Sequence, residues 1–89
     1  MKHQIQANQL ADLVSSATDI ARRSPSGIAT ILKYKGNYEA KRADFMAGDF
    51  VYVVFRDGSY EQWDPAKSRD YLRRAQEINE QLASCDESR

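Results

Sequence analysis

Two stretches of the chain repeat apolar residues at spacings of three and four, which predicts an amphipathic helix near each end. The first covers residues 8–23, and its apolar stripe consists of Leu10, Leu13, Val14, Ala17, Ile20 and Ala21. The second follows Pro65, and its stripe consists of Tyr71, Leu72, Ala75, Ile78 and Leu82. Asn8 and Asp64 are placed to cap these helices, because short polar side chains accept hydrogen bonds from the free amides of a first helical turn.

The residues between the two helices fall into short apolar and β-branched runs separated by turn residues, which predicts β-strands. Strands are expected near 28–34 and 38–44, joined by a turn in Lys35-Gly36-Asn37, where glycine and asparagine tolerate positive φ. A clearer hairpin is expected between Phe50 and Trp63. Its Asp57-Gly58 dipeptide is typical of a type I′ turn.

A two-residue loop at Asp57-Gly58 would decide which side chains of the second hairpin share a face. It pairs Phe55 with Tyr60 and Tyr52 with Trp63. One face then holds Val51, Val53, Phe55 and Tyr60, and the other holds Phe50, Tyr52, Val54 and Trp63. Both faces are largely apolar, so we expect a central hairpin with helices over one face and the other face covered in part or available to a partner.

These elements predict one α+β domain over residues 1–89, with loose termini at 1–7 and 84–89. The order along the chain is α-β-β-β-β-α, and the short connections favour pairing between neighbouring strands. We therefore expect a two-layer domain, in which a four-stranded antiparallel meander carries both helices on one face. A chain of 89 residues has room for a single domain of this kind.

Charge is unevenly distributed along a chain whose formal net charge is zero. Residues 22–42 carry six basic residues against one acid, whereas residues 43–89 carry ten acids against six bases. Zero net charge argues against a dedicated polyanion binder, but the asymmetry can mark an interaction face or a self-complementary assembly.

Residues that support catalysis or metal binding do not occur in the combinations that such sites need. His3 is the single histidine and Cys85 the single cysteine, so one chain can form neither a disulfide nor a Cys/His zinc site. Asp44, Asp49 and Asp57 fit turns, where aspartate is common. The glycines are scattered, without a phosphate-binding loop. We expect no enzyme, no catalytic residue, no metal and no cofactor.

Localisation follows from two further features of the composition. The N-terminal residues lack the apolar run of a signal peptide, and no stretch approaches the length of a membrane span. A small protein without a disulfide framework suits a reducing compartment. The sequence therefore predicts a cytoplasmic protein without a membrane partner.

The first hairpin and the end of the first helix combine basic and aromatic residues, and they form the predicted partner-binding surface. Its members are Arg22, Arg23, Lys33, Lys35, Tyr38 and Arg42. Residues 33, 35, 38 and 42 can share a face if the turn lies at Gly36-Asn37. The same lysines can instead protect an edge hairpin from aggregation, with the tyrosines in the core.

The function that fits these features is a small interaction module acting through a protein partner or its own homodimer, as in an accessory protein of bacterial or phage type. A first alternative is nucleic-acid binding, with the basic residues on phosphates and the tyrosines stacked on bases. A second alternative is a small-molecule pocket or dimer seam formed by Tyr52, Tyr60 and Trp63, although such aromatic residues more often belong to a core.

Overall fold

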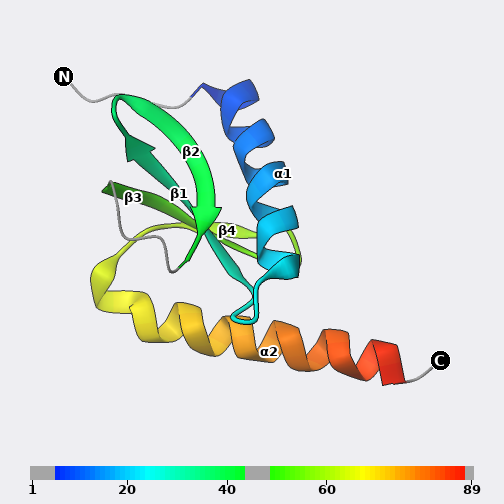
Figure 1. The fold of residues 1–89 in the computed structure, drawn as a ribbon. Helices are drawn as coiled ribbons and strands as arrows, with labels where there is room; N and C mark the ends of the chain where they lie inside the picture. Colours follow the sequence, from blue (N-terminus) through cyan, green and yellow to red (C-terminus); the bar gives the residue numbers. More distant parts are fainter. Residues whose placement is uncertain (1–5, 44–48, 88–89) are drawn as a thin grey trace.

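A computed structural model describes residues 6–43 and 49–87 of the chain. Its elements in order are α1 (Ala7–Arg23), β1 (Ile28–Tyr34), β2 (Asn37–Arg42), β3 (Asp49–Phe55), β4 (Tyr60–Gln62), a 3₁₀ turn (Pro65–Lys67) and α2 (Ser68–Glu87) (Figure 1). The predicted α+β class and the order α-β-β-β-β-α are confirmed. His3, Asp44 and the side chain of Cys85 lie outside the described part, as do most of the residues predicted to form loose termini.

The four strands form one antiparallel sheet in the order β2-β1-β3-β4, so the predicted meander order is wrong. Strand β3 pairs with β1 and not with β2. The apolar composition of β1 and β3 explains this order, and the burial of the strands follows from it. Strand β1 is buried over its first five residues and β3 over its last three, whereas β2 and β4 contain no buried residue. The two apolar strands therefore take the central positions and the polar ones the edges.

The turn of the first hairpin lies one residue earlier than the predicted Gly36-Asn37 turn. Lys33 pairs with Tyr38 and Tyr34 with Asn37, which leaves Lys35 and Gly36 as the loop. Both loop residues have positive φ, at 51° and 82°, as a type I′ turn requires.

The second hairpin has a longer loop than predicted. The Phe55 amide donates to the Ser59 carbonyl at 2.9 Å, and the Gly58 amide donates to the Phe55 carbonyl at 3.0 Å. Within this loop only Gly58 has positive φ, at 88°, so the turn ends in a glycine bulge and is not of type I′. Tyr60 consequently pairs with Val54, not with Phe55, and its side chain lies on the opposite face from the predicted one.

Strand β3 also contains a bulge that the alternation of its residues does not predict. Ile31 pairs with Tyr52 and the next residue, Leu32, pairs with Phe50, so Val51 is the extra residue in β3. A bulge reverses the alternation of side chains along the strand. Phe50 and Tyr52 therefore point to opposite faces, although the sequence placed them together.

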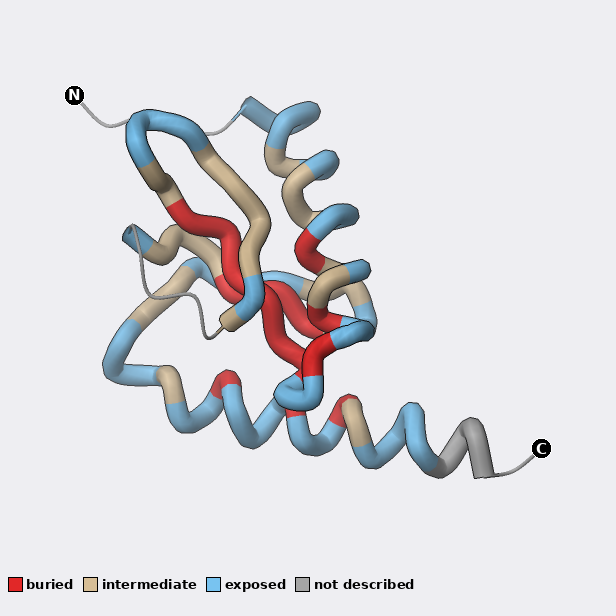
Figure 2. The backbone as a smooth tube through the Cα atoms, viewed as in Figure 1, coloured by how far each residue is buried: buried red, intermediate tan, exposed pale blue. Residues whose placement is uncertain are grey.

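The two helices pack on opposite faces of the sheet, which corrects the predicted two-layer arrangement to three layers. Helix α1 contributes Ala17 and Ala21 to a buried cluster with Ala29, Ile31 and Val54. Helix α2 contributes a second cluster, which consists of Tyr71, Ala75 and Ile78 packed on Ile28, Val53 and Phe55. Figure 2 shows the buried segments of β1 and β3 between the two helices. Because β1 is apolar on both faces, each face needs its own helix.

The helix ends follow local rules only in part. Asp64 accepts a hydrogen bond from the Ala66 amide at 3.0 Å, which confirms its predicted capping role. Helix α1 begins at Ala7, so Asn8 lies inside the first turn and is not its cap. The last turns of α2 extend past the sheet, where Leu82 is exposed although it continues the buried stripe (Figure 1).

Candidate functional site

The predicted basic surface is divided between the two ends of the first hairpin. Lys33, Lys35 and Tyr38 lie at the tip, whereas Arg42 lies at the far end of β2. Tyr38 and Arg42 are four residues apart, which is about 13 Å in an extended strand. Lys33, Tyr38 and Arg42 share the face of β1 and β2 on which α1 packs, as predicted, but Lys35 belongs to the turn.

Several of these residues also have contacts within the chain. Arg23 pairs with Asp19 at 3.1 Å along α1, and Arg22 donates from Nε to the Arg56 carbonyl at 3.3 Å. Lys35 Nζ lies over the ring of Tyr34, 5.3 Å from its centroid. Tyr38 and Arg42 interact with other groups as well. The basic residues therefore do not converge on one site.

The three aromatic residues predicted to line a pocket or seam lie on two faces. Tyr52 and Tyr60 meet edge to face on the α1 side, with ring centroids 5.7 Å apart. Trp63 lies on the α2 side, where it contacts Phe50 and Tyr71 at 5.4 Å and 5.5 Å between centroids. An apolar cavity of about 130 Å³ adjoins the rings of Phe50, Trp63 and Tyr71. The longer loop brings Tyr60, and not Trp63, to the face of Tyr52, and the bulge at Val51 places Phe50 on the face of Trp63.

A larger hollow, which we call the α1–β4 groove, runs between α1 and the second hairpin. Its volume is about 890 Å³. It is lined by Ala7, Leu10, Ala11, Val14, Ser15, Ser16, Thr18, Asp19, Arg22, Gly58 and Tyr60. Most of the α1 residues here are small, so the helix leaves open space beside β4. Tyr60 is 44% exposed in this groove and rests against Tyr52.

Strand β4 forms the free edge of the sheet beside the groove. It has three residues, and all are exposed. The Trp63 amide donates to the Val51 carbonyl and the Phe55 amide to the Ser59 carbonyl, so residues 59, 61 and 63 direct their backbone groups toward β3. Because antiparallel strands alternate in this respect, Tyr60 and Gln62 direct theirs outward. The Tyr71 hydroxyl donates to the outward carbonyl of Gln62 at 2.8 Å.

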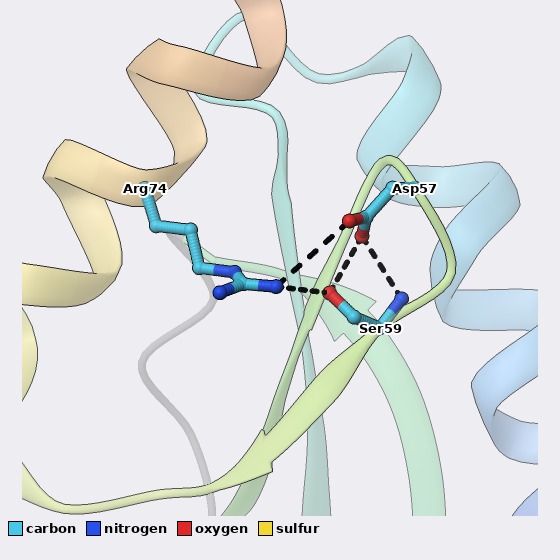
Figure 3. Close-up of polar contacts among 3 residues, drawn as sticks. All are labelled: Asp57, Ser59 and Arg74. Atoms are coloured by element: carbon cyan, nitrogen blue, oxygen red, sulfur yellow. Dashed lines mark hydrogen bonds and ion pairs between the residues drawn. The ribbon is translucent and has the colours of Figure 1, made fainter.

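The loop that precedes β4 is attached to both helices. Arg56 donates to the Ala21 carbonyl at 3.1 Å and to the Ser24 carbonyl at 2.7 Å, and so satisfies the C-terminal end of α1. From α2, Arg74 donates to the Ser59 hydroxyl at 3.1 Å and lies 3.9 Å from the Asp57 carboxylate (Figure 3). These contacts hold the groove wall in place.

Asp57 organises the same loop through its carboxylate. Its Oδ1 accepts from the Ser59 hydroxyl at 2.6 Å and from the Ser59 amide at 2.9 Å. Partial burial raises the pKa of Asp57, but the Ser59 hydrogen bonds and the charge of Arg74 outweigh it, so the pKa lies below its ordinary value of 3.8. The turn role predicted for this aspartate agrees with these contacts.

Sequence reasoning missed the groove because neither of its walls is unusual in sequence. On α1 the relevant signal is the row Ala7, Ala11, Ser15 and Thr18, small residues beside the apolar stripe. Such a row of small residues indicates an open side of a helix only when the element packed beside the helix is known. Arg22 is the one residue that belongs both to the predicted basic set and to the groove.

Comparison with family models, curated proteins and solved structures finds no match for this chain. Within residues 6–43 and 49–87, no three His, Cys, Asp or Glu side chains gather as metal ligands. Over the same described residues, no helix combines the length and the apolar character needed to cross a membrane. The α1–β4 groove, with its volume of about 890 Å³, is the feature from which a function is argued below.

Proposed function

We propose that this protein is a small non-enzymatic interaction module that binds a partner protein in the α1–β4 groove. One observation carries the proposal: an open hollow of about 890 Å³ lies beside an exposed edge strand and contains the exposed ring of Tyr60. Tyrosines are frequent anchors in protein interfaces, because they supply a large contact area at low conformational entropy. The mixture of apolar and polar groups along the groove also resembles a protein interface in composition.

The groove supports this function better than the basic hairpin does. The basic residues lie at two ends of the hairpin, and Arg22 and Arg23 already have contacts within the chain. In the proposal, Arg22 contributes its charge at one end of the groove. Electrostatic complementarity there would raise the association rate more than the affinity.

A homodimer is the weaker form of the same proposal. Each face of the sheet carries its own helix, which removes the reason to expect a second copy over an uncovered apolar face. The proposal retains the expectation of a cytoplasmic accessory protein of bacterial or phage type that acts without a cofactor. The competing hypothesis is nucleic-acid binding at the tip of the first hairpin, and the test below distinguishes the two.

The test is affinity capture from a lysate with a variant that fills the groove. Ala11 lies on the groove wall and is exposed, so Ala11→Arg occupies the hollow without entering the core. Gln9→Arg is the matched control, since it adds the same side chain to an exposed position of α1 outside the groove. We expect the wild type and Gln9→Arg to capture the same protein and Ala11→Arg to lose it.

Equal capture by both variants would overturn the proposed site. Retention of an oligonucleotide instead of a protein, abolished by Lys33→Glu together with Lys35→Glu, would return the site to the hairpin tip. Sedimentation of the purified protein separates a second copy from a different partner, because a dimer doubles the mass of 10.2 kDa.

A further inference from the structure

We propose, on the basis of the function proposed above, that the partner segment binds as an extended strand added to the outer edge of β4. The outward backbone groups of Tyr60 and Gln62 have the spacing of one face of a ladder. An added antiparallel strand would pair with the amide and carbonyl of Tyr60 and with the amide of Gln62. This mode of recognition takes its affinity from main-chain hydrogen bonds and its specificity from alternate side chains.

The placement of the helices determines where the side chains of the added strand point. Successive residues of a strand face opposite sides of a sheet. On one side they meet the α1–β4 groove, where Leu10, Val14 and Tyr60 offer apolar surface among small and polar residues. On the other they meet a polar hollow of about 290 Å³ between β4 and α2. One strand would therefore fill two hollows of different chemistry.

The hollow on the α2 side favours a basic side chain. Its lining combines the carboxylates of Glu61, Asp70 and Glu77 with the guanidinium groups of Arg73 and Arg74. The charge of Arg74 is partly balanced by Asp57, at 3.9 Å. The remaining charge is acidic, so a lysine or arginine fits the positions that face α2. The partner segment is thus an extended peptide that alternates apolar and basic residues.

A second copy of this chain is a poorer occupant of the same edge. Two β4 strands paired antiparallel about their centres would set Glu61 directly opposite the partner's Glu61. Like charges in directly opposed positions destabilise a pair of strands. Strand β4 also offers only three residues to such a contact. Short, charged edge strands are a common protection against self-pairing.

The experiment uses a fluorescent peptide that alternates valine and lysine, titrated against the whole protein and followed by anisotropy. Gln62→Pro removes one outward amide and leaves the β3 ladder intact, because proline is tolerated where the amide faces away from the sheet. Gln62→Val is the matched control, since it keeps the amide and favours the strand. We expect Gln62→Pro to weaken binding by roughly fivefold relative to Gln62→Val, as the loss of one hydrogen bond would.

Two further peptides separate strand pairing from simple attraction of charge. A peptide of the same composition with its valines grouped should bind more weakly, and so should one that alternates valine and glutamate. Equal binding of the alternating peptide to Gln62→Pro and Gln62→Val, or no binding to either, overturns strand addition. The Ala11→Arg capture result is independent of this comparison, so the proposed function can survive that outcome or fail by itself.

Discussion

The two faces of the sheet are covered by helices in different ways. On the α1 side the contact is made by alanines, with Ala17, Ala21 and Ala29 fully buried against Ile31 and Val54. On the α2 side it is made by rings, with Phe55, Tyr71 and Trp63 in a tilted series. Small side chains let a helix lie close along a sheet, whereas rings hold it away and leave space, here a cavity of about 130 Å³.

The polar contacts follow the same division. Helix α2 is attached to the rest of the molecule by Tyr71 to the Gln62 carbonyl, Arg74 to Ser59 and Asn79 to the Pro25 carbonyl. Helix α1 is linked to Arg56 at its C-terminal end, where the Arg56 side chain donates to the Ala21 and Ser24 carbonyls and Arg22 donates to the Arg56 carbonyl. The α1 contact therefore depends on side-chain volume, and the α2 contact depends on rings positioned by hydrogen bonds.

The largest effect is expected from Phe55→Ala on the α2 side. Phe55 is fully buried, contacts Tyr71 and lies under the guanidinium of Arg74. Its removal should lower the free energy of unfolding by about 3–5 kcal/mol, measured by chemical denaturation. Phe55→Leu, which keeps more of the volume, should lose less and remain folded. Equal losses for the two variants would show that cavity size does not govern this contact.

On the α1 side, enlarging a buried residue should destabilise the protein, as truncating a buried residue does on the α2 side. Ala21→Leu places extra carbon atoms in a fully buried position and should lower the free energy of unfolding by about 1–3 kcal/mol. Ala11→Leu makes the same change on the exposed groove wall of the same helix and should be near neutral. A neutral Ala21→Leu would mean that α1 can move away from the sheet, contrary to close packing.

A smaller loss of stability is expected from Gly27→Ala, at the place where α2 meets the loop after α1. Gly27 has a φ of 72°, and a Cβ atom there would lie 2.5 Å from Asn79 Oδ1. Gly36 has a similar φ of 82° with open space around it, so Gly36→Ala measures backbone strain alone, about 1–2 kcal/mol. Thermal and chemical denaturation should show a greater loss for Gly27→Ala than for Gly36→Ala. Equal losses of stability would indicate that the Asn79 side chain moves aside at no cost.

The smallest effect is expected from Asp57→Asn at the polar link to α2. The folded pKa of Asp57 lies below its ordinary 3.8, so the charged carboxylate stabilises the protein above that pH. This stabilisation is lost as the pH falls through the folded pKa. At neutral pH the variant should be less stable by under about 1 kcal/mol, since the pair with Arg74 is exposed. Denaturation at several pH values should show the difference vanish in acid; a constant difference would contradict the assignment.

Local signals in the sequence predicted the elements well. The stripe of α1 placed that helix to within a residue at its start, and Asp64 marked the beginning of the last helical segment. These features depend on neighbours one to four residues apart, so they can be read from the chain. The turn signals were less reliable, because Asp57-Gly58 is compatible with more than one loop length.

The candidate site could be predicted only in its parts. Arg22, Tyr52 and Tyr60 were singled out from the sequence, but Tyr60 was placed on the wrong face and Trp63 took its place beside Tyr52. The error for Tyr60 came from a loop longer by one residue, which reverses the direction of the β4 side chains relative to β3. The bulge at Val51 caused a separate error, because it moves Phe50 to the face opposite Tyr52. No local pattern announces the bulge.

The α+β class and the order of the elements could be read from composition and short-range periodicity, because both depend on neighbours close in the chain. The strand order, the placement of the helices on opposite faces and the groove beside Tyr60 emerge only when the chain is packed. These depend on which apolar surfaces compete for the centre of the sheet, and that competition involves residues far apart in the chain. Strand β1 illustrates the point: its apolar character was plain, but its two covering helices appear only in the packed molecule.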